Sequence, residues 1–114
     1  MKLYEYLIDY GIKEEDHLFY RDDDSSLTYG EALDEARKLA DFLLTRKARG
    51  RVAAFYGNDP KDQLLFFLAA EMVEARPLLL HEYLKEGDLA ELLAERPIDF
   101  FLSRRDFPSL SLQE

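Results

Sequence analysis

The chain has 114 residues, a formal net charge of −9 and a hydrophobic content of 47%. This length suits a single domain, and the hydrophobic content supports a folded core, which excludes an intrinsically disordered chain. The acidic charge repels nucleic-acid backbones and anionic lipid, so we expect no nucleic acid and no membrane among its partners. The chain contains no cysteine, which excludes disulfides and thiolate chemistry.

The first predicted element is a short N-terminal helix. Leu3, Leu7 and Ile8 fall on one face, with Tyr4 alongside, and Gly11 is placed to end the helix. We expect this helix to cover the fold as a lid, outside the core. The same stretch contains acidic residues and lacks the apolar region of a signal peptide, and no run of the chain approaches the length of a membrane span. We therefore expect a cytoplasmic protein.

Residues 17–21 and 26–28 predict a β-hairpin, because two extended runs flank an Asp/Ser turn whose side chains can bond their own backbone. A long helix follows, which Thr28 and Glu31 begin as a T-x-x-E capping box. Its apolar residues recur at three- and four-residue steps, namely Tyr29, Ala32, Leu33, Ala36, Leu39, Ala40, Leu43 and Leu44. One face of this helix is therefore predicted to be buried, and Gly50 supplies its stop.

A strand and a second long helix follow. RVAAFYG, residues 51–57, is short and nearly continuously apolar, which is typical of a parallel strand covered on both faces. Asp59 as the N-cap and Pro60 at the first helical position begin the helix. Its seven consecutive apolar residues, 64–70, are too many for a helix with one wet side. Either this fold sandwiches the helix, or another body covers it.

The strand and helix pattern then repeats. Residues 77–83, PLLLHEY, predict a second buried strand, and Asp88 with Glu91 forms a capping box for a helix that Pro97 ends. Residues 98–103, IDFFLS, predict a third strand.

This order of elements predicts an α/β layered fold: a mostly parallel sheet with crossover helices and an N-terminal β-hairpin. A fully helical alternative is weaker, because the runs at 51–56 and 98–102 are short and bounded by Gly or Pro. We take residues 1–104 as one α/β domain and residues 105–114 as an edge strand or loose tail.

Two acidic clusters are candidates for metal binding, and each has a simpler structural interpretation. Asp22, Asp23 and Asp24 offer oxygen ligands to a divalent cation, but they lack the spacing of a calcium loop and fit a solvated turn. His17 follows the acidic run 14–16, yet an exposed histidine at the entrance of a strand is the simpler interpretation. We assign no metal-binding residue.

His81 follows the second strand run, at the carboxyl edge where α/β sheets place ligands. No serine or carboxylate is evidently paired with it, so a small hydrolase that uses His81 stays a minor hypothesis. Arg104 and Arg105 can pair with an anion, although surface charge beside Asp106 is simpler. The chain has no G-x-G-x-x-G and no Walker loop to cradle a phosphate. We assign no catalytic and no cofactor-binding residue.

The stretch LTYGEALDEARKLADFLL, residues 27–44, resembles the LTYxELxxxaxxLAxxL segment near the N-terminus of adenylate-forming (AMP-binding) enzymes, which include acyl-CoA synthetases and nonribosomal peptide adenylation domains. Three further segments resemble the family in the same order, so that the resemblance covers about residues 2–104; they are residues 50–60, 67–80 and 88–101. The chain departs from the family pattern at three positions. Arg49 stands where the family has a glycine-rich turn, and the family's aspartate before Arg51 is absent. Glu74 replaces the glycine that usually precedes Ala75.

The resemblance implies the N-terminal subdomain of an acyl-CoA synthetase-like ligase. Its parent reaction uses ATP and magnesium to activate a carboxylate as an acyl-adenylate, and the acyl group then usually passes to a thiol. The family's phosphate loop, aromatic-Gly-x-Thr-Glu motif, ribose-binding aspartate and C-terminal lysine have no counterpart before Glu114.

From this resemblance we expect no catalysis and no cofactor for this chain alone. The remainder of the ligase, or a second copy of the chain, is the expected partner. The alternative is a free-standing interaction or regulatory module that reuses the fold without catalysis. The carboxylate substrate and the acceptor thiol stay open.

Overall fold

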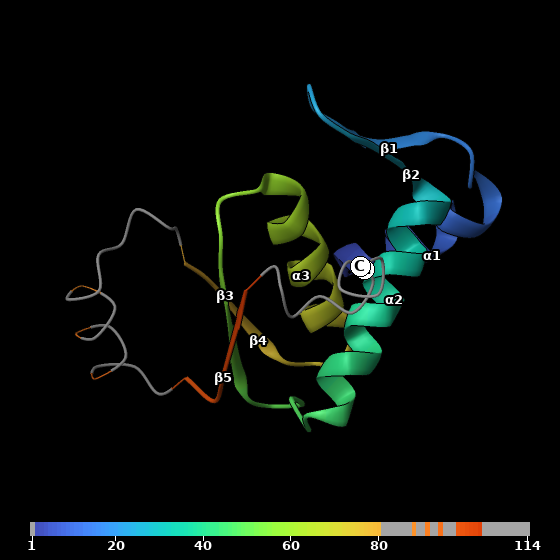
Figure 1. The fold of residues 1–114 in the computed structure, drawn as a ribbon. Coiled ribbons are helices and arrows are strands. Elements are labelled where there is room, and N and C mark those ends of the chain that lie inside the picture. The colour runs from blue at the N-terminus through green and yellow to red at the C-terminus, as the bar shows by residue number, and fades with distance from the viewer. Residues whose placement is uncertain (1, 81–87, 89–90, 92–93, 95–97, 104–114) are drawn as a thin grey trace.

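A computed structural model describes residues 2–80, 88, 91, 94 and 98–103 of the chain (Figure 1). The described elements confirm the predicted α/β class. In chain order they are α1 (Leu3–Lys13), β1 (Leu18–Arg21), β2 (Ser26–Thr28), α2 (Tyr29–Thr45), β3 (Val52–Tyr56), α3 (Pro60–Met72), β4 (Arg76–Leu80) and β5 (Phe100–Ser103).

The main sheet is parallel, and β3 is its central described strand in the order β4-β3-β5. Ala54 of β3 lies opposite Leu78 on one side and Phe101 on the other. Ala53, Ala54 and Phe55 are fully buried, as the continuous apolar run predicted. The strand β4 is less buried than predicted, because it pairs with β3 alone among the described strands and leaves Leu79 exposed.

The predicted hairpin is present, with β1 and β2 antiparallel. The capping box that follows it is also confirmed: the Glu31 backbone N–H donates to Thr28 Oγ1 at 3.2 Å, and the Thr28 N–H donates to Glu31 Oε1 at 2.9 Å. These two bonds satisfy amides that the first turn of α2 would otherwise leave without partners. The start of α2 is thus fixed by local sequence.

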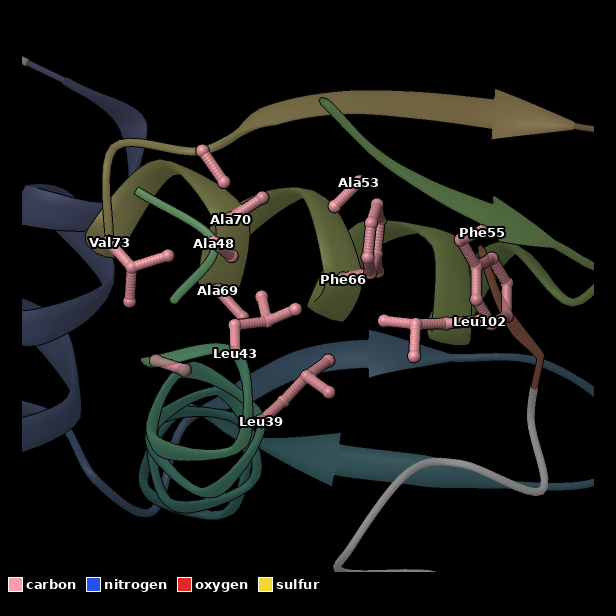
Figure 2. Close-up of a cluster of buried hydrophobic side chains, with 12 residues drawn as sticks. Leu39, Leu43, Ala48, Ala53, Phe55, Phe66, Ala69, Ala70, Val73 and Leu102 are labelled. Carbon is pink, nitrogen blue, oxygen red and sulfur yellow. The ribbon is translucent and has the colours of Figure 1, made fainter. Parts of the chain in front are cut away.

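The helix α3 lies between the sheet and α2 and is buried on two sides (Figure 1). Toward the sheet, its Phe66 stacks on Phe55 with ring centroids 5.5 Å apart, in a core that Leu39, Leu43 and other residues of α2 complete (Figure 2). On its other side Leu65 and Leu68 join a second core with residues of α1, β2 and α2, which comprises Leu7, Leu27, Ala32, Leu33 and Ala36. The apolar run 64–70 is therefore sandwiched within this chain at Leu65, Phe66 and residues 68–70, as the first alternative held, while Leu64 and Phe67 are partly exposed.

The helix α1 differs from its prediction in two ways. Gly11 lies inside the helix and does not end it, and Leu7 is buried at 2% exposure in the second core. A Cβ at Gly11 would lie 2.6 Å from Leu33 Cδ2, so the glycine lets α1 approach α2 closely. The helix is thus part of the core and is more than a lid, while Leu3 of its predicted inner face is exposed.

The helix α2 ends five residues before the predicted glycine stop. Its last residue is Thr45, and Lys47 takes the left-handed conformation with φ 58°. The Ala48 N–H donates to Leu43 O at 3.1 Å and the Lys47 N–H to Leu44 O at 2.9 Å, which is the Schellman pattern. Gly50 also has positive φ, at 74°, but in the turn that leads to β3. Leu44, predicted on the buried face, is exposed.

The structure describes only some of the residues to which the predictions after β4 refer. The strand β5 confirms the core of the predicted strand 98–103. Residues 88, 91 and 94 are helical and exposed, which agrees with a helix in this segment. Asp88 lies within the helix and not at the N-cap position that the capping box assigned to it, and the other residues of the predicted helix lie outside the described ones. The predicted tail 105–114 also lies outside them.

Candidate functional site

The carboxyl ends of the three parallel strands meet at one edge of the sheet, where α/β folds bind ligands. We term residues 56–59, Leu80 and Ser103 the carboxyl edge. The Gly57 N–H donates to Leu80 O at 3.0 Å, and Gln63 Nε2 donates to Gly57 O at 2.8 Å. These bonds join the end of β3 to β4 and to α3, so they position the edge without offering a reactive group.

The N-terminus of α3 faces this edge, and a helix N-terminus attracts anions. In this protein, side-chain carboxylates of the chain itself lie at the N-terminus of α3, where an anion would bind. Asp59 Oδ1 accepts from the Lys61 N–H at 2.9 Å, and Asp62 lies in the first turn at 1% exposure. Two carboxylates at the positive end of the helix dipole stabilise the helix and repel a phosphate. The carboxylates of Asp59 and Asp62 therefore disfavour binding of an ATP phosphate at the N-terminus of α3.

A further acidic side chain, Glu35 of α2, interacts electrostatically with Asp62. Partial burial raises the pKa of its carboxyl, and the charge of Asp62 adds to this effect, while Lys61 opposes it. A carboxyl with a raised pKa is a candidate general acid only where a ligand can reach it with a second functional group. The described residues place no such constellation beside Glu35, so we interpret its pKa as a consequence of packing between α2 and α3.

The predicted acidic turn is structural. Asp22 Oδ1 accepts from the Asp24 N–H at 2.8 Å and the Ser25 N–H at 2.7 Å, and Tyr20 Oη donates to Asp22 Oδ2 at 2.7 Å. The tyrosine hydroxyl and these backbone bonds lower the pKa of Asp22 to about 2, and the same hydroxyl bond raises the pKa of Tyr20 to about 12. All of these bonds serve the turn, as its simpler interpretation required.

The other candidates are scattered. His17 is exposed, and its Nε2 lies 3.2 Å from Glu14 Oε2. In the described ranges no group of three or more histidine and acidic side chains is placed to hold a metal ion. His81, Arg104 and Arg105 lie outside the described residues. None of the helices in the described part of the chain is both long and apolar enough to cross a membrane.

Two tertiary contacts were not predicted from the sequence. Glu71 Oε1 of α3 accepts from the Tyr4 N–H at 2.8 Å and so satisfies an amide in the first turn of α1, across 67 residues. Arg49 pairs with Glu74 at 3.2 Å. No local pattern announces the first contact. The Arg49–Glu74 pair joins two positions that depart from the family pattern. Their opposite charges at these two positions are visible in the sequence and could have predicted the pair.

Solved structures share this fold. VinN superposes with a TM-score of 0.80 at 18% identity, over 89% of this chain and 27% of VinN. The N-terminal subdomain of Klebsiella oxytoca NpsA gives 0.77 at 18% identity, over 89% of this chain and 27% of that one. NpsA-ThdA is an artificially fused adenylation-PCP di-domain nonribosomal peptide synthetase from the same organism. It superposes with a TM-score of 0.77 at 19% identity, over 90% of this chain and 20% of NpsA-ThdA. No family model matches the chain, and no curated protein sequence does.

The chain thus has the fold found in the N-terminal subdomain of adenylation enzymes, which confirms at the level of fold the resemblance seen in its sequence. It spans 27% of an NpsA chain that is itself described as an N-terminal subdomain. The part shared is therefore a fraction of that chain, and in this protein its described residues form a parallel sheet with α2 and α3 on one face.

Proposed function

We propose that the chain is the N-terminal, non-catalytic portion of an acyl-CoA synthetase-like, adenylate-forming ligase. One observation carries the proposal: a fold that fills 89% of this chain recurs as 27% of a larger adenylation-enzyme chain. In the parent reaction a carboxylate attacks the α-phosphate of ATP and pyrophosphate leaves; a thiol then attacks the carbonyl carbon of the acyl-adenylate, which forms a thioester and releases AMP. This portion would supply scaffold to that enzyme.

The charge at the carboxyl edge supports a non-catalytic role. Transfer of the adenylyl group of ATP to a carboxylate requires positive charge around the phosphates of ATP. Asp59 and Asp62 give the N-terminus of α3 the opposite sign. ATP and magnesium would therefore be held by the remainder of the parent enzyme. A cytoplasmic location accords with a reaction that consumes ATP.

The described sheet supports the remainder of the ligase as partner. The strands β4 and β5 each pair only with β3 among the described strands, so each has an outer edge that a further strand can extend. A second copy of the chain could meet the same edges. The remainder of the ligase is the better proposal, because the matched structures contain this layer within a longer chain.

A free-standing interaction or regulatory module is the second candidate, and one observation favours it. Both sides of α3 are buried within this chain, so the core is closed without a partner. A fold that closes its own core can be kept as an independent module. On this reading the protein is a monomer or closed dimer with no ligase companion.

Native mass spectrometry of the protein from the cells that make it separates the two candidates. The ligase proposal predicts either a chain heavier than 13.4 kDa or a stable complex with a companion that carries the Ser/Thr/Gly-rich phosphate loop. A lone 13.4 kDa chain, with no such companion under gentle ionisation, would overturn the proposal and support the module.

A further inference from the structure

The edge of the sheet opposite the carboxyl edge carries a group of basic side chains. The amino ends of the three parallel strands meet there, beside the end of α2 (Figure 1). Residues 46–51 contain four basic side chains and no acidic one, and the first residue of β4 adds a fifth. All five are exposed, and we term them the basic patch; they are Arg46, Lys47, Arg49, Arg51 and Arg76.

Backbone hydrogen bonds hold the basic patch together, although its members come from two separate turns. The Arg76 N–H donates to Arg51 O at 2.8 Å, and the Gly50 N–H donates to Glu74 O at 2.9 Å. Ala48, in the middle of the segment 46–51, is fully buried in the core between α2, α3 and the sheet. The backbone that presents the cations is therefore ordered before a partner binds, which lowers the entropic cost of binding.

The fold accounts for only part of this charge. Arg49 pairs with Glu74, and the Cζ atom of Arg46 lies 5.0 Å from the centroid of the Phe42 ring. The dipole of α2 favours cations only near its last turn, so it does not explain the two arginines at the starts of β3 and β4. Three members of the patch have no ion pair within the described residues, namely Lys47, Arg51 and Arg76. Their charges are available to a partner.

Few carboxylates of the described residues offset the basic patch. Glu74 forms its ion pair there, and Asp99 Oδ2 accepts from the Val52 N–H at 2.9 Å. Asp41 precedes Arg46 by five residues, which is more than one helical turn. The patch therefore keeps a surplus of positive charge on a chain whose formal net charge is −9. The N-terminus of α3, beside the opposite edge, is acidic, so the two ends of the sheet differ in charge.

Charge and extent decide which partner fits the basic patch. At physiological ionic strength exposed charges attract each other over about 8 Å, so a bound group senses the patch and little of the rest of the chain. A nucleic-acid backbone or an anionic bilayer extends beyond this distance and meets the acidic remainder, which repels it. A second copy brings a further net charge of −9. A short acidic segment of another protein has its carboxylates only where the cations lie. Its apolar side chains can contact Leu44, which is 52% exposed in the last turn of α2.

We propose that the basic patch binds a short acidic segment of another protein. Carboxylates of the segment pair with Lys47, Arg51 and Arg76, and arginine can hold a carboxylate through two parallel hydrogen bonds. This surface goes beyond the proposed ligase function, which uses the fold and the outer edges of β4 and β5. A lone chain in native mass spectrometry would leave the binding role of the patch intact, and a peptide that fails to bind would leave the ligase proposal intact.

Binding of designed peptides to the full chain, followed by NMR, tests the role of the basic patch. The probe is a Glu-rich peptide with two leucines, about eight residues long and so at most roughly 28 Å in extended length. Its matched control has Gln at every Glu. We expect the Glu peptide to shift the backbone amide signals of residues 47–51 and of Arg76, and to bind more weakly as salt rises. The Gln peptide should not bind.

Variants locate the contact. Arg51→Gln and Arg76→Gln should each weaken binding of the Glu peptide by about two- to fivefold, as the loss of one partner of an exposed ion pair does. Lys13→Gln removes the same charge from α1, where Lys13 pairs with Asp9, and should leave binding unchanged. Circular dichroism confirms that each variant is folded.

Four results would overturn the binding of an acidic segment. The first is no shift at residues 47–51 and Arg76 with the Glu peptide, or equal binding of the Gln peptide. The second is equal weakening by Lys13→Gln and Arg51→Gln. The third is tighter binding of single-stranded DNA or phosphatidylserine vesicles that Arg51→Gln abolishes, which would make the patch a nucleic-acid or lipid contact. The fourth is self-association that Arg51→Gln abolishes, which would make a second copy the partner.

Discussion

The Nη2 atom of Arg49 lies 3.2 Å from both carboxylate oxygens of Glu74. Glu74 has φ 60°, a left-handed conformation that favours glycine, and it stands where the adenylate-forming enzymes that this chain resembles have glycine. The Gly50 N–H donates to Glu74 O at 2.9 Å beside the pair. Two of the chain's departures from the family pattern therefore form one contact between the turns that enter β3 and β4.

Replacing Glu74 by glycine sets two effects against each other. The left-handed backbone costs a non-glycine residue roughly 1–2 kcal/mol, whereas an exposed ion pair contributes roughly 0.2–1 kcal/mol. We expect Glu74→Gly to raise the free energy of unfolding by up to about 2 kcal/mol in urea titrations. A loss of stability would show that the pair with Arg49 outweighs the backbone strain.

Lys47 provides the matched comparison. It has φ 58° at the equivalent position after α2, and no ion pair of its ammonium occurs in the described ranges. Lys47→Gly should therefore stabilise the protein more than Glu74→Gly does, since only strain is removed. An equal or larger gain from Glu74→Gly would contradict a stabilising role for the Arg49 pair.

Gly11→Ala should destabilise the protein by roughly 1–3 kcal/mol, as overpacked cores do. The new Cβ would lie 2.6 Å and 2.9 Å from Leu33 Cδ2 and Cβ, and this clash outweighs the roughly 1 kcal/mol that alanine gains in helix propensity. Ile12→Ala, at an exposed position of the same helix, is the control and should change stability far less. A Gly11→Ala variant as stable as the parent would refute the close approach of α1 to α2.

Glu71 should control the first turn of α1. Glu71→Ala leaves the Tyr4 N–H without its acceptor, so we expect faster hydrogen exchange at that amide and a loss of roughly 1.5–3 kcal/mol, typical of a hydrogen bond to a charged group. Glu71→Gln keeps an acceptor oxygen and should retain most of the protection. Unchanged exchange at Tyr4 in Glu71→Ala would contradict the contact.

The hairpin turn should respond to pH through Asp22. Its pKa is lowered from 3.8 to about 2, so the carboxylate stabilises the turn fully above pH 3.8, and this stabilisation is lost as pH falls through about 2. Carboxyl carbon NMR shifts of Asp22 give this titration directly. Tyr20→Phe removes the hydroxyl donor and should move the Asp22 midpoint upward, whereas an unchanged midpoint would exclude that hydrogen bond as a cause.

The sequence predicted those features that local chemistry determines. The capping box of Thr28 and Glu31, the Asp59 cap with Pro60, and the Asp22 turn depend on residues within three positions of one another. The apolar run 51–57 also predicted the buried strand β3, and the two extended runs around the Asp/Ser turn predicted the hairpin. Local signals of this kind hold because the same few residues supply both the donor and the acceptor.

Features that depend on tertiary packing were less predictable. Gly11 was interpreted as a helix stop, because local pattern cannot distinguish a terminal glycine from one that a neighbouring helix approaches. The two-sided burial of α3 required knowing that α1 and α2 cover the side away from the sheet. The ring contacts of Tyr29 with Tyr10 and Phe19 likewise form only when α1, β1 and α2 are brought together.

Carboxylate-dependent ATP–pyrophosphate exchange by the purified chain is the most direct test of the central proposal, that this α/β layer is scaffold without catalysis. The assay supplies ATP, magnesium and a panel of amino, aryl and fatty acids. We predict exchange no greater than that of a blank without protein, because Asp59 and Asp62 make the N-terminus of α3 acidic beside the carboxyl edge, where the reaction needs positive charge. Exchange that depends on both the chain and a carboxylate would contradict the proposal.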